Sequence, residues 1–217
     1  IIRLYDKDFI RIDPTGKASA MFKAIPSELT RNSSRYQVAS VTENGRANRL
    51  LETITNMGES MVVNMAYHAN DPGPGMAFHK DTSTFKMFVG DTGLFVTLAF
   101  WDKEFTDNVI YQKLLTDKLS KDLGYVYENV VAQMLVASGN ELYYHTFPTE
   151  SGKHRYEVDF LIPDGDKVVP IEVKSSGYKA HVSLDAFCTK FSSRVSRPYL
   201  IYTKDLRKEG NLLYLPV

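Results

Sequence analysis

Residues 157–174 read EVDFLIPDGDKVVPIEVK, and this stretch decides the fold. Apolar and β-branched residues fill both of its ends. The middle, PDGD at residues 163–166, is a turn sequence in which glycine supplies a positive φ. We therefore predict a β-hairpin whose strands cover residues 155–162 and 167–174.

Two carboxylates and a lysine lie on this hairpin. Asp159 and Glu172 are near the ends of adjacent strands, and Lys174 returns to the face of Glu172 because strand side chains alternate. Mg²⁺ takes oxygen ligands and keeps several waters. A lysine beside the ion can position a water or stabilise developing negative charge. From the preceding helix, Glu128 can complete the site. We predict Glu128, Asp159 and Glu172 as ligands of Mg²⁺ or Mn²⁺, and these three with Lys174 as catalytic residues.

The surrounding segments predict the fold class. Residues 121–138 carry apolar side chains at helical spacing, and Gly139 is a stop signal. Further strands are expected at 141–147, 198–202 and 212–215, and a second helix at 182–191. A helix, three strands, a helix and a strand is typical of an α/β sandwich with a mixed sheet flanked by helices.

The first hundred residues follow another pattern. Apolar spacing predicts helices over residues 18–29, where Pro26 is expected to break the helix or start a new turn, and over residues 42–57. Strand-like runs at 60–67 and 84–89 flank a loop rich in Pro and Gly. Two helices followed by two strands suggest a winged-helix-like α+β segment.

We expect two domains, the winged-helix-like segment at residues 1–93 and the mixed-sheet domain at residues 94–217. The chain opens Ile1-Ile2-Arg3, without Met. We therefore expect it to be a fragment whose natural N-terminal part is missing.

Composition narrows the function classes. The net charge is zero and the pI is about 7.1, which argues against strong non-specific nucleic-acid binding but leaves room for a local basic patch. A single cysteine, Cys188, rules out a disulfide framework or a Cys-based zinc site within the chain. No histidines have zinc-site spacing, although His145 and His154 could meet across the first hairpin. No apolar run approaches the roughly 18 residues of a membrane span. Nor is there a basic-then-apolar leader, so we expect a cytoplasmic location without a membrane partner.

Four cationic residues are candidate nucleic-acid contacts. Arg46 and Arg49 share the helix that a winged-helix protein would place in a major groove. The alternative is a solvated polar face, which suits the neutral overall charge. Lys179 and Lys190 lie late in the sequence, where they could line a phosphate track beside the carboxylates or merely balance them.

The order of Glu128, Asp159, Glu172 and Lys174 resembles that of PD-(D/E)XK nucleases, the restriction-endonuclease-like fold. In that fold, carboxylates hold Mg²⁺ and the lysine positions or activates a water. One departure is Val158, which precedes Asp159 where active nucleases usually have proline.

Residues 84–204 also resemble the C-terminal domain of unknown function that follows the ATPase module in many prokaryotic AAA-type ATPases. Residues 1–83 resemble, less specifically, the segment that joins the two. The matching stretches are FKMFVGDTGL at 85–94, GYVYEN at 124–129, YY at 143–144, EVDF at 157–160 and PIEVKSS at 170–176. The resemblance implies an ATPase domain outside this chain. Because the chain has no Walker phosphate-binding motif, ATP is expected only in that absent domain.

Two function classes follow. The first is a nuclease-like module that binds DNA or RNA and cleaves it with Mg²⁺. The second is a catalytically inactive interaction or oligomerisation module that regulates the absent ATPase domain, with that domain or a second copy of the chain as its partner. The arrangement of Glu128, Asp159, Glu172 and Lys174 in the folded chain discriminates between them.

Overall fold

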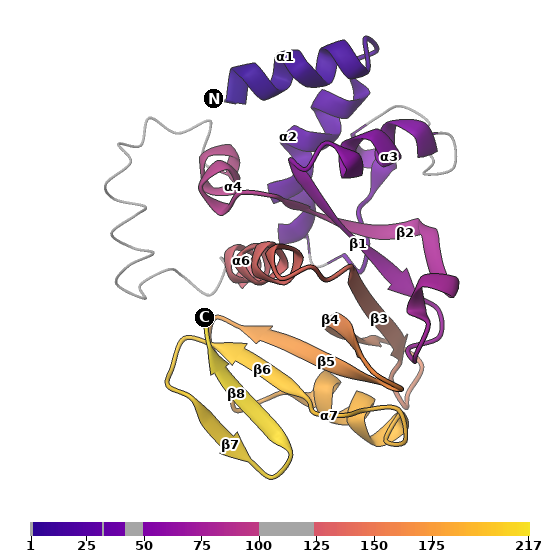
Figure 1. Cartoon of the computed structure of the whole chain (residues 1–217), viewed down its shortest axis with the longest axis vertical. Helices are drawn as coiled ribbons and strands as arrows, with labels where there is room; N and C mark the ends of the chain where they lie inside the picture. The colour runs from indigo at the N-terminus through magenta and orange to yellow at the C-terminus, as the bar shows by residue number, and fades with distance from the viewer. Residues whose placement is uncertain (1, 32, 42–49, 100–123) are drawn as a thin grey trace. The chain divides into compact units, whose positions relative to one another are not determined.

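The computed structural model describes residues 2–31, 33–41, 50–99 and 124–217 (Figure 1). Within these ranges the fold is mixed α/β, with six α-helices and one mixed sheet of eight strands. The strand order is β2-β1-β3-β4-β5-β6-β8-β7. No helix in the described ranges is both long and apolar enough to span a membrane.

Contacts divide the chain into two compact units. The first comprises Ile1–Met65 and Ser83–Asn129, and the second comprises Ala66–Thr82 and Val130–Val217. This division differs from the expected domains at residues 1–93 and 94–217, which stay a prediction. Strands β1 (Val63–Ala69) and β2 (Lys80–Val89) and helix α6 (Gly124–Ala137) each contribute residues to both units.

Helices dominate the first unit. They are α1 (Ile2–Ile12), α2 (Lys17–Thr30), the short 3₁₀ helix η1 (Val38–Ser40), α3 (Leu51–Glu59) and α4 (Thr92–Ala99). Asp91 caps α4, because its Oδ1 accepts the backbone N–H of Leu94 at 2.7 Å. The expected helix at residues 42–57 is described from Leu51 onward, and its earlier part lies outside the described residues.

Pro26 lies inside α2, which continues to Thr30, so the expectation that Pro26 would break or restart the helix was wrong. A proline in a helix interior costs about 3 kcal/mol. Phe22 and Ile25 on the same helix are fully buried, and burying each such side chain contributes about 1.5–3 kcal/mol. Burial therefore offsets the missing hydrogen bond.

The two strand-like runs of the first half are β1 (Val63–Ala69) and β2 (Lys80–Val89), with the 3₁₀ helix η3 (Met76–Phe78) between them. Strands β1 and β2 are adjacent in the sheet, as the two strands of a winged-helix hairpin would be. They do not end in a free wing, however, because β1 also pairs in parallel with β3 (Leu142–Pro148). The two strands thus extend the main sheet.

The predicted hairpin is present as β4 (Arg155–Asp164) and β5 (Lys167–Lys174). The strands pair antiparallel, and the turn between them holds Gly165 at φ 61°. On its other edge β5 pairs in parallel with β6 (Tyr199–Tyr202). Since β5 is flanked on both sides and Val168 to Val173 are buried, it is a central strand.

The sheet ends in β8 (Leu212–Pro216) and β7 (Arg207–Glu209). β8 pairs in parallel with β6, and the short strand β7 pairs antiparallel with β8. The sequence did not predict β7, because its three residues are charged and exposed. A short charged edge strand of this kind discourages edge-to-edge association.

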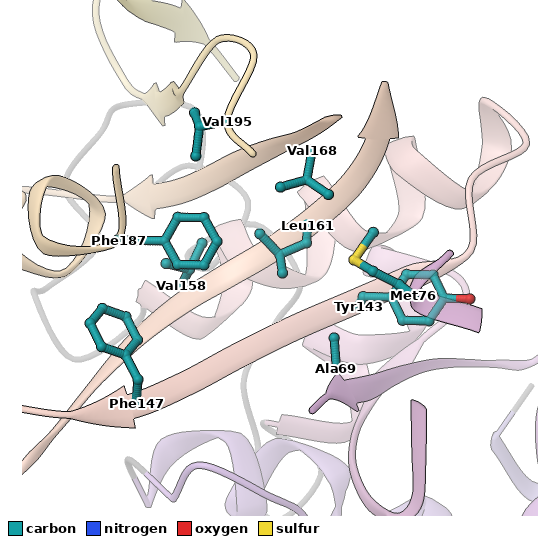
Figure 2. Close-up of a cluster of buried hydrophobic side chains, with 9 residues drawn as sticks. All are labelled: Ala69, Met76, Tyr143, Phe147, Val158, Leu161, Val168, Phe187 and Val195. Carbon is teal, nitrogen blue, oxygen red and sulfur yellow. The ribbon is translucent and has the colours of Figure 1, made fainter. Parts of the chain in front are cut away.

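Helix α7 (Val182–Lys190) covers β4 and β5. Its Phe187 lies in a buried apolar cluster, shown in Figure 2, to which four strands and two connecting segments also contribute. The cluster comprises Ala69, Met76, Tyr143, Phe147, Val158, Leu161, Val168, Phe187 and Val195. This core fixes the relative positions of β3, β4 and β5, and so of the residues at their ends.

Candidate functional site

The strand register brings Asp159 and Glu172 together. The β4–β5 register ends where Phe160 lies opposite Ile171. Asp159 and Glu172 are the next residues along their strands beyond this pair. The two carboxylates therefore lie at the same end of the paired strands.

A β-bulge lies at Asp159. Between β3 and β4, Tyr143 is opposite Leu161 but His145 is opposite Val158, so β4 has one residue more than β3 in this interval. Asp159 and Phe160 thus share the place opposite Tyr144. Bulges of this kind redirect a side chain and are common beside functional sites. No pattern in the sequence signalled this one.

Lys174 forms an ion pair with Glu172. Its Nζ lies 2.6 Å from Glu172 Oε1, and the side chain of Glu172 is 6% exposed while that of Lys174 is 30% exposed. A buried carboxylate is costly without a partner of opposite charge. Lys174 supplies that charge at the end of β5, as the alternation along the strand predicted.

Asp159 is tied to the neighbouring strand. Its Oδ2 accepts the backbone N–H of Val173 at 2.7 Å. This bond lies where the regular ladder between β4 and β5 ends, and it fixes the Asp159 side chain beside the residue that follows Glu172. Three of the four predicted catalytic residues, Asp159, Glu172 and Lys174, are thereby brought together.

Glu128 lies on α6 (Gly124–Ala137), in the part of that helix that belongs to the first unit. Its convergence with the strand residues stays a prediction. Within the described ranges, no group of three or more His, Cys, Asp or Glu side chains is arranged to hold a metal ion. Asp159 and Glu172 are the predicted metal ligands on the strands, and their metal binding stays a prediction.

Two of the four predicted nucleic-acid contacts lie within the described residues. Lys179 is exposed in the loop that follows β5. Lys190 ends α7, where its Nζ lies 5.0 Å from the ring centre of Phe147 and 5.4 Å from that of Phe191. Arg46 and Arg49 lie outside the described residues.

A cluster of tyrosines with an arginine adjoins the ion pair, and the sequence did not point to it. Lys174 and Tyr202 are neighbours in the β5–β6 register. The Tyr202 ring packs against Tyr178 and Tyr214 at centroid distances of 5.1 and 5.5 Å. The Arg207 guanidinium lies 4.1 Å from the ring centre of Tyr214 and 5.7 Å from that of Tyr178. The residues come from three separate segments, so no local spacing reveals the cluster.

His145 meets His68, and not His154 as the sequence allowed. The two rings stack at 5.4 Å, and His145 Nδ1 donates to the carbonyl of Ala69 at 2.7 Å. Burial lowers the pKa of His145 to about 4. It is therefore a neutral core histidine.

Residues 123–217, less than half of the chain, match the model of a domain of unknown function, DUF4143. The match covers α6, β3 to β8 and α7, and so includes Glu128, Asp159, Glu172 and Lys174. It confirms the expected similarity to a domain of unknown function. No curated protein and no solved structure matches the chain.

Proposed function

We propose that the chain contains a nuclease-like module in which Asp159 and Glu172 bind a divalent cation beside Lys174. The observation that supports it most is that Asp159 and Glu172 lie at the same end of the β4–β5 pair, with the ammonium of Lys174 at 2.6 Å from Glu172. The substrate class is a phosphodiester of DNA or RNA. In this proposal the fold is of the PD-(D/E)XK type, and the parent protein is an AAA-type ATPase.

The chemistry needs both acidic residues and the lysine. Carboxylate oxygens are the protein ligands that Mg²⁺ prefers, and the bound ion would polarise a phosphate and a water. Asp159, held by the Val173 N–H, and Glu172, held in the strand, are oriented before any cation binds. Once a cation neutralises Glu172, Lys174 can release that carboxylate and direct its ammonium at a phosphate oxygen.

A second candidate is the catalytically inactive interaction module. The observation that favours it is that both carboxylates already have structural partners, the Val173 N–H and the Lys174 ammonium. In that case the ion pair stabilises the end of β5, and the module acts by contacting the ATPase domain or a second copy of the chain.

Metal titration separates the two candidates. The whole chain should bind Mn²⁺ with one-site stoichiometry, measured by calorimetry. Asp159→Asn and Glu172→Gln should each weaken binding because each removes a ligand charge. With Mn²⁺ or Mg²⁺, the wild type should cut DNA or RNA, and EDTA should stop it. Lys174→Met should still bind Mn²⁺ but cut on the order of 10²–10³ times more slowly.

Glu157→Gln is the matched control, since Glu157 precedes the bulge on the same strand and lies opposite Thr146. It removes the same charge and should leave Mn²⁺ affinity unchanged. Lys174→Arg retains the cation beside the buried Glu172. It is the second variant to measure in case Lys174→Met does not fold. If the wild type binds no Mn²⁺, or binds it equally without Asp159 and Glu172, the interaction module takes the place of the nuclease.

A further inference from the structure

The tyrosine and arginine cluster lies at the same end of the sheet as the candidate metal site. Strands β5 and β6 run in parallel and end side by side at Lys174 and Tyr202. The loops that follow them, residues 175–181 and 203–206, therefore leave the sheet together. Tyr178 lies in the first loop, and Arg207 follows the second. Any chain that reached Lys174 from this side would pass these loops.

One side of the cluster is buried in the protein, and the other side is exposed to solvent. Tyr214 is buried, and its hydroxyl donates to Glu209 Oε2 at 2.9 Å. The buried Tyr202 ring meets Tyr178 edge-on. Tyr178 itself is partly exposed, and the Arg207 side chain is 41% exposed above the rings. A rigid aromatic base therefore presents one tyrosine and one guanidinium plane to solvent.

Each of the two loops also carries an exposed cation. Lys179 is next to Tyr178 in sequence, and Lys204 lies in the loop after β6. Glu209 offsets part of the charge of Arg207, with its Oε1 at 3.1 Å from Arg207 Nη2. Aromatic rings and arginine planes stack on unpaired bases, and neighbouring cations follow the phosphates. The combination suits a nucleotide chain better than a peptide.

We propose that Tyr178 and Arg207 form a base-stacking subsite that selects single-stranded nucleic acid, or an unpaired end, for the site at Lys174. This inference rests on the proposed function, because it assigns the substrate of that same site. A base within a duplex is already stacked and paired, so it cannot reach Tyr178. An unpaired base can stack there while its phosphates contact Lys179 or Lys204.

The test measures binding without chemistry. Fluorescence anisotropy in EDTA compares a short labelled single strand with the blunt duplex of the same sequence over a range of salt concentrations. The whole chain should bind the single strand more tightly. Tyr178→Ala should weaken that binding roughly 5- to 100-fold. Tyr178→Phe should retain it, because the stacking ring remains. Arg207→Ala should also weaken binding, because it removes the second stacking plane.

Lys208→Ala is the matched charge control. Lys208 is adjacent to Arg207 on β7, so its side chain projects from the other face of the strand. The Lys208→Ala variant should bind the single strand with the affinity of the wild type. Equal affinity for single strand and duplex, no binding of the single strand, or wild-type affinity in Tyr178→Ala would each overturn the subsite. So would equal effects of Lys208→Ala and Arg207→Ala.

The two proposals fail separately. Loss of the Tyr178 effect with intact Mn²⁺ binding removes the subsite and leaves the metal site. If the chain prefers single strands in a way that depends on Tyr178 but does not bind Mn²⁺, the subsite stands as a binding surface. The nuclease proposal then fails.

Discussion

His145 shows how a single buried residue links stability to pH. Its ring lies against Phe147, Phe187 and Phe191, and it is 5% exposed. Burial lowers its pKa to about 4 from the ordinary 6.5, and the positive groups Lys190 and Arg155 act in the same direction. The hydrogen bond to the Ala69 carbonyl opposes this shift only partly.

We predict that His145 costs the protein stability in mild acid. Between pH 6.5 and about 4 the unfolded chain binds a proton at this residue and the folded chain does not, so the free energy of unfolding falls as the pH falls. The midpoint of thermal unfolding should decrease more steeply over that window in the wild type than in His145→Gln. Glutamine cannot be protonated there and keeps a donor for Ala69. Parallel pH profiles for the two proteins would contradict this.

At the scale of elements, Asn129 joins α6 to the end of β2. Its side chain is fully buried. It accepts the backbone N–H of Val89 at 2.8 Å and donates to the Val89 carbonyl at 3.0 Å and to Thr92 Oγ1 at 3.2 Å. The side-chain amide thus makes the backbone hydrogen bonds that a neighbouring strand would make. It does so at the end of β2, just before α4 begins.

Replacing Asn129 should loosen this junction. In Asn129→Ala both polar groups of Val89 lose their partner in a buried place, and each unsatisfied group costs about 1–3 kcal/mol. Chemical denaturation should show a loss of roughly 2–6 kcal/mol for the two groups together. A loss below about 1 kcal/mol in the alanine variant would show that water replaces the amide.

The strand elements also show what a bulge contributes. The extra residue in β4 lets Val158 and Leu161, which are three positions apart, both enter the apolar cluster of Figure 2, and Asp159 lies between them in sequence. One strand, β4, thus contributes to both the core and the candidate site. The register of the whole strand does not have to shift by one residue.

At the scale of the molecule, the segment that matches the family model is not the whole sheet. Strand β1 lies outside residues 123–217 but pairs with β3. Ala69 and Met76 belong to the same cluster as Phe187, and the loop after β1 pairs Asp71 with Arg194. The second unit therefore depends on chain from before the matched segment.

We predict that residues 124–217 alone fold less stably than the whole chain. Without β1, strand β3 becomes an edge with unpaired backbone groups, and the core loses Ala69 and Met76. Hydrogen exchange at β3 amides should be faster in the fragment, and those of β5 and β6 should be affected less. The fragment for this comparison is residues 124–217 alone. A fragment that also carried residues 66–82 would not serve, because its connection between residues 66–82 and 124–217 would differ from that in the whole chain. Equal β3 protection in fragment and whole chain would contradict the prediction.

The sequence by itself determined most elements of the second unit, β7 excepted, and the order of its chemical groups. Strand alternation put Glu172 and Lys174 on one face, and the turn at Gly165 set the β4–β5 register. These are local properties, since they follow from neighbours a few residues apart.

Tertiary structure alone decided the rest. The bulge at Asp159, the place of β1 beside β3, and the meeting of Tyr178 with Arg207 depend on segments far apart in sequence. Pro26 remained helical because buried neighbours outweighed its local preference. Such outcomes follow from the sum of packing free energies over the whole fold, and no window of the sequence contains that sum.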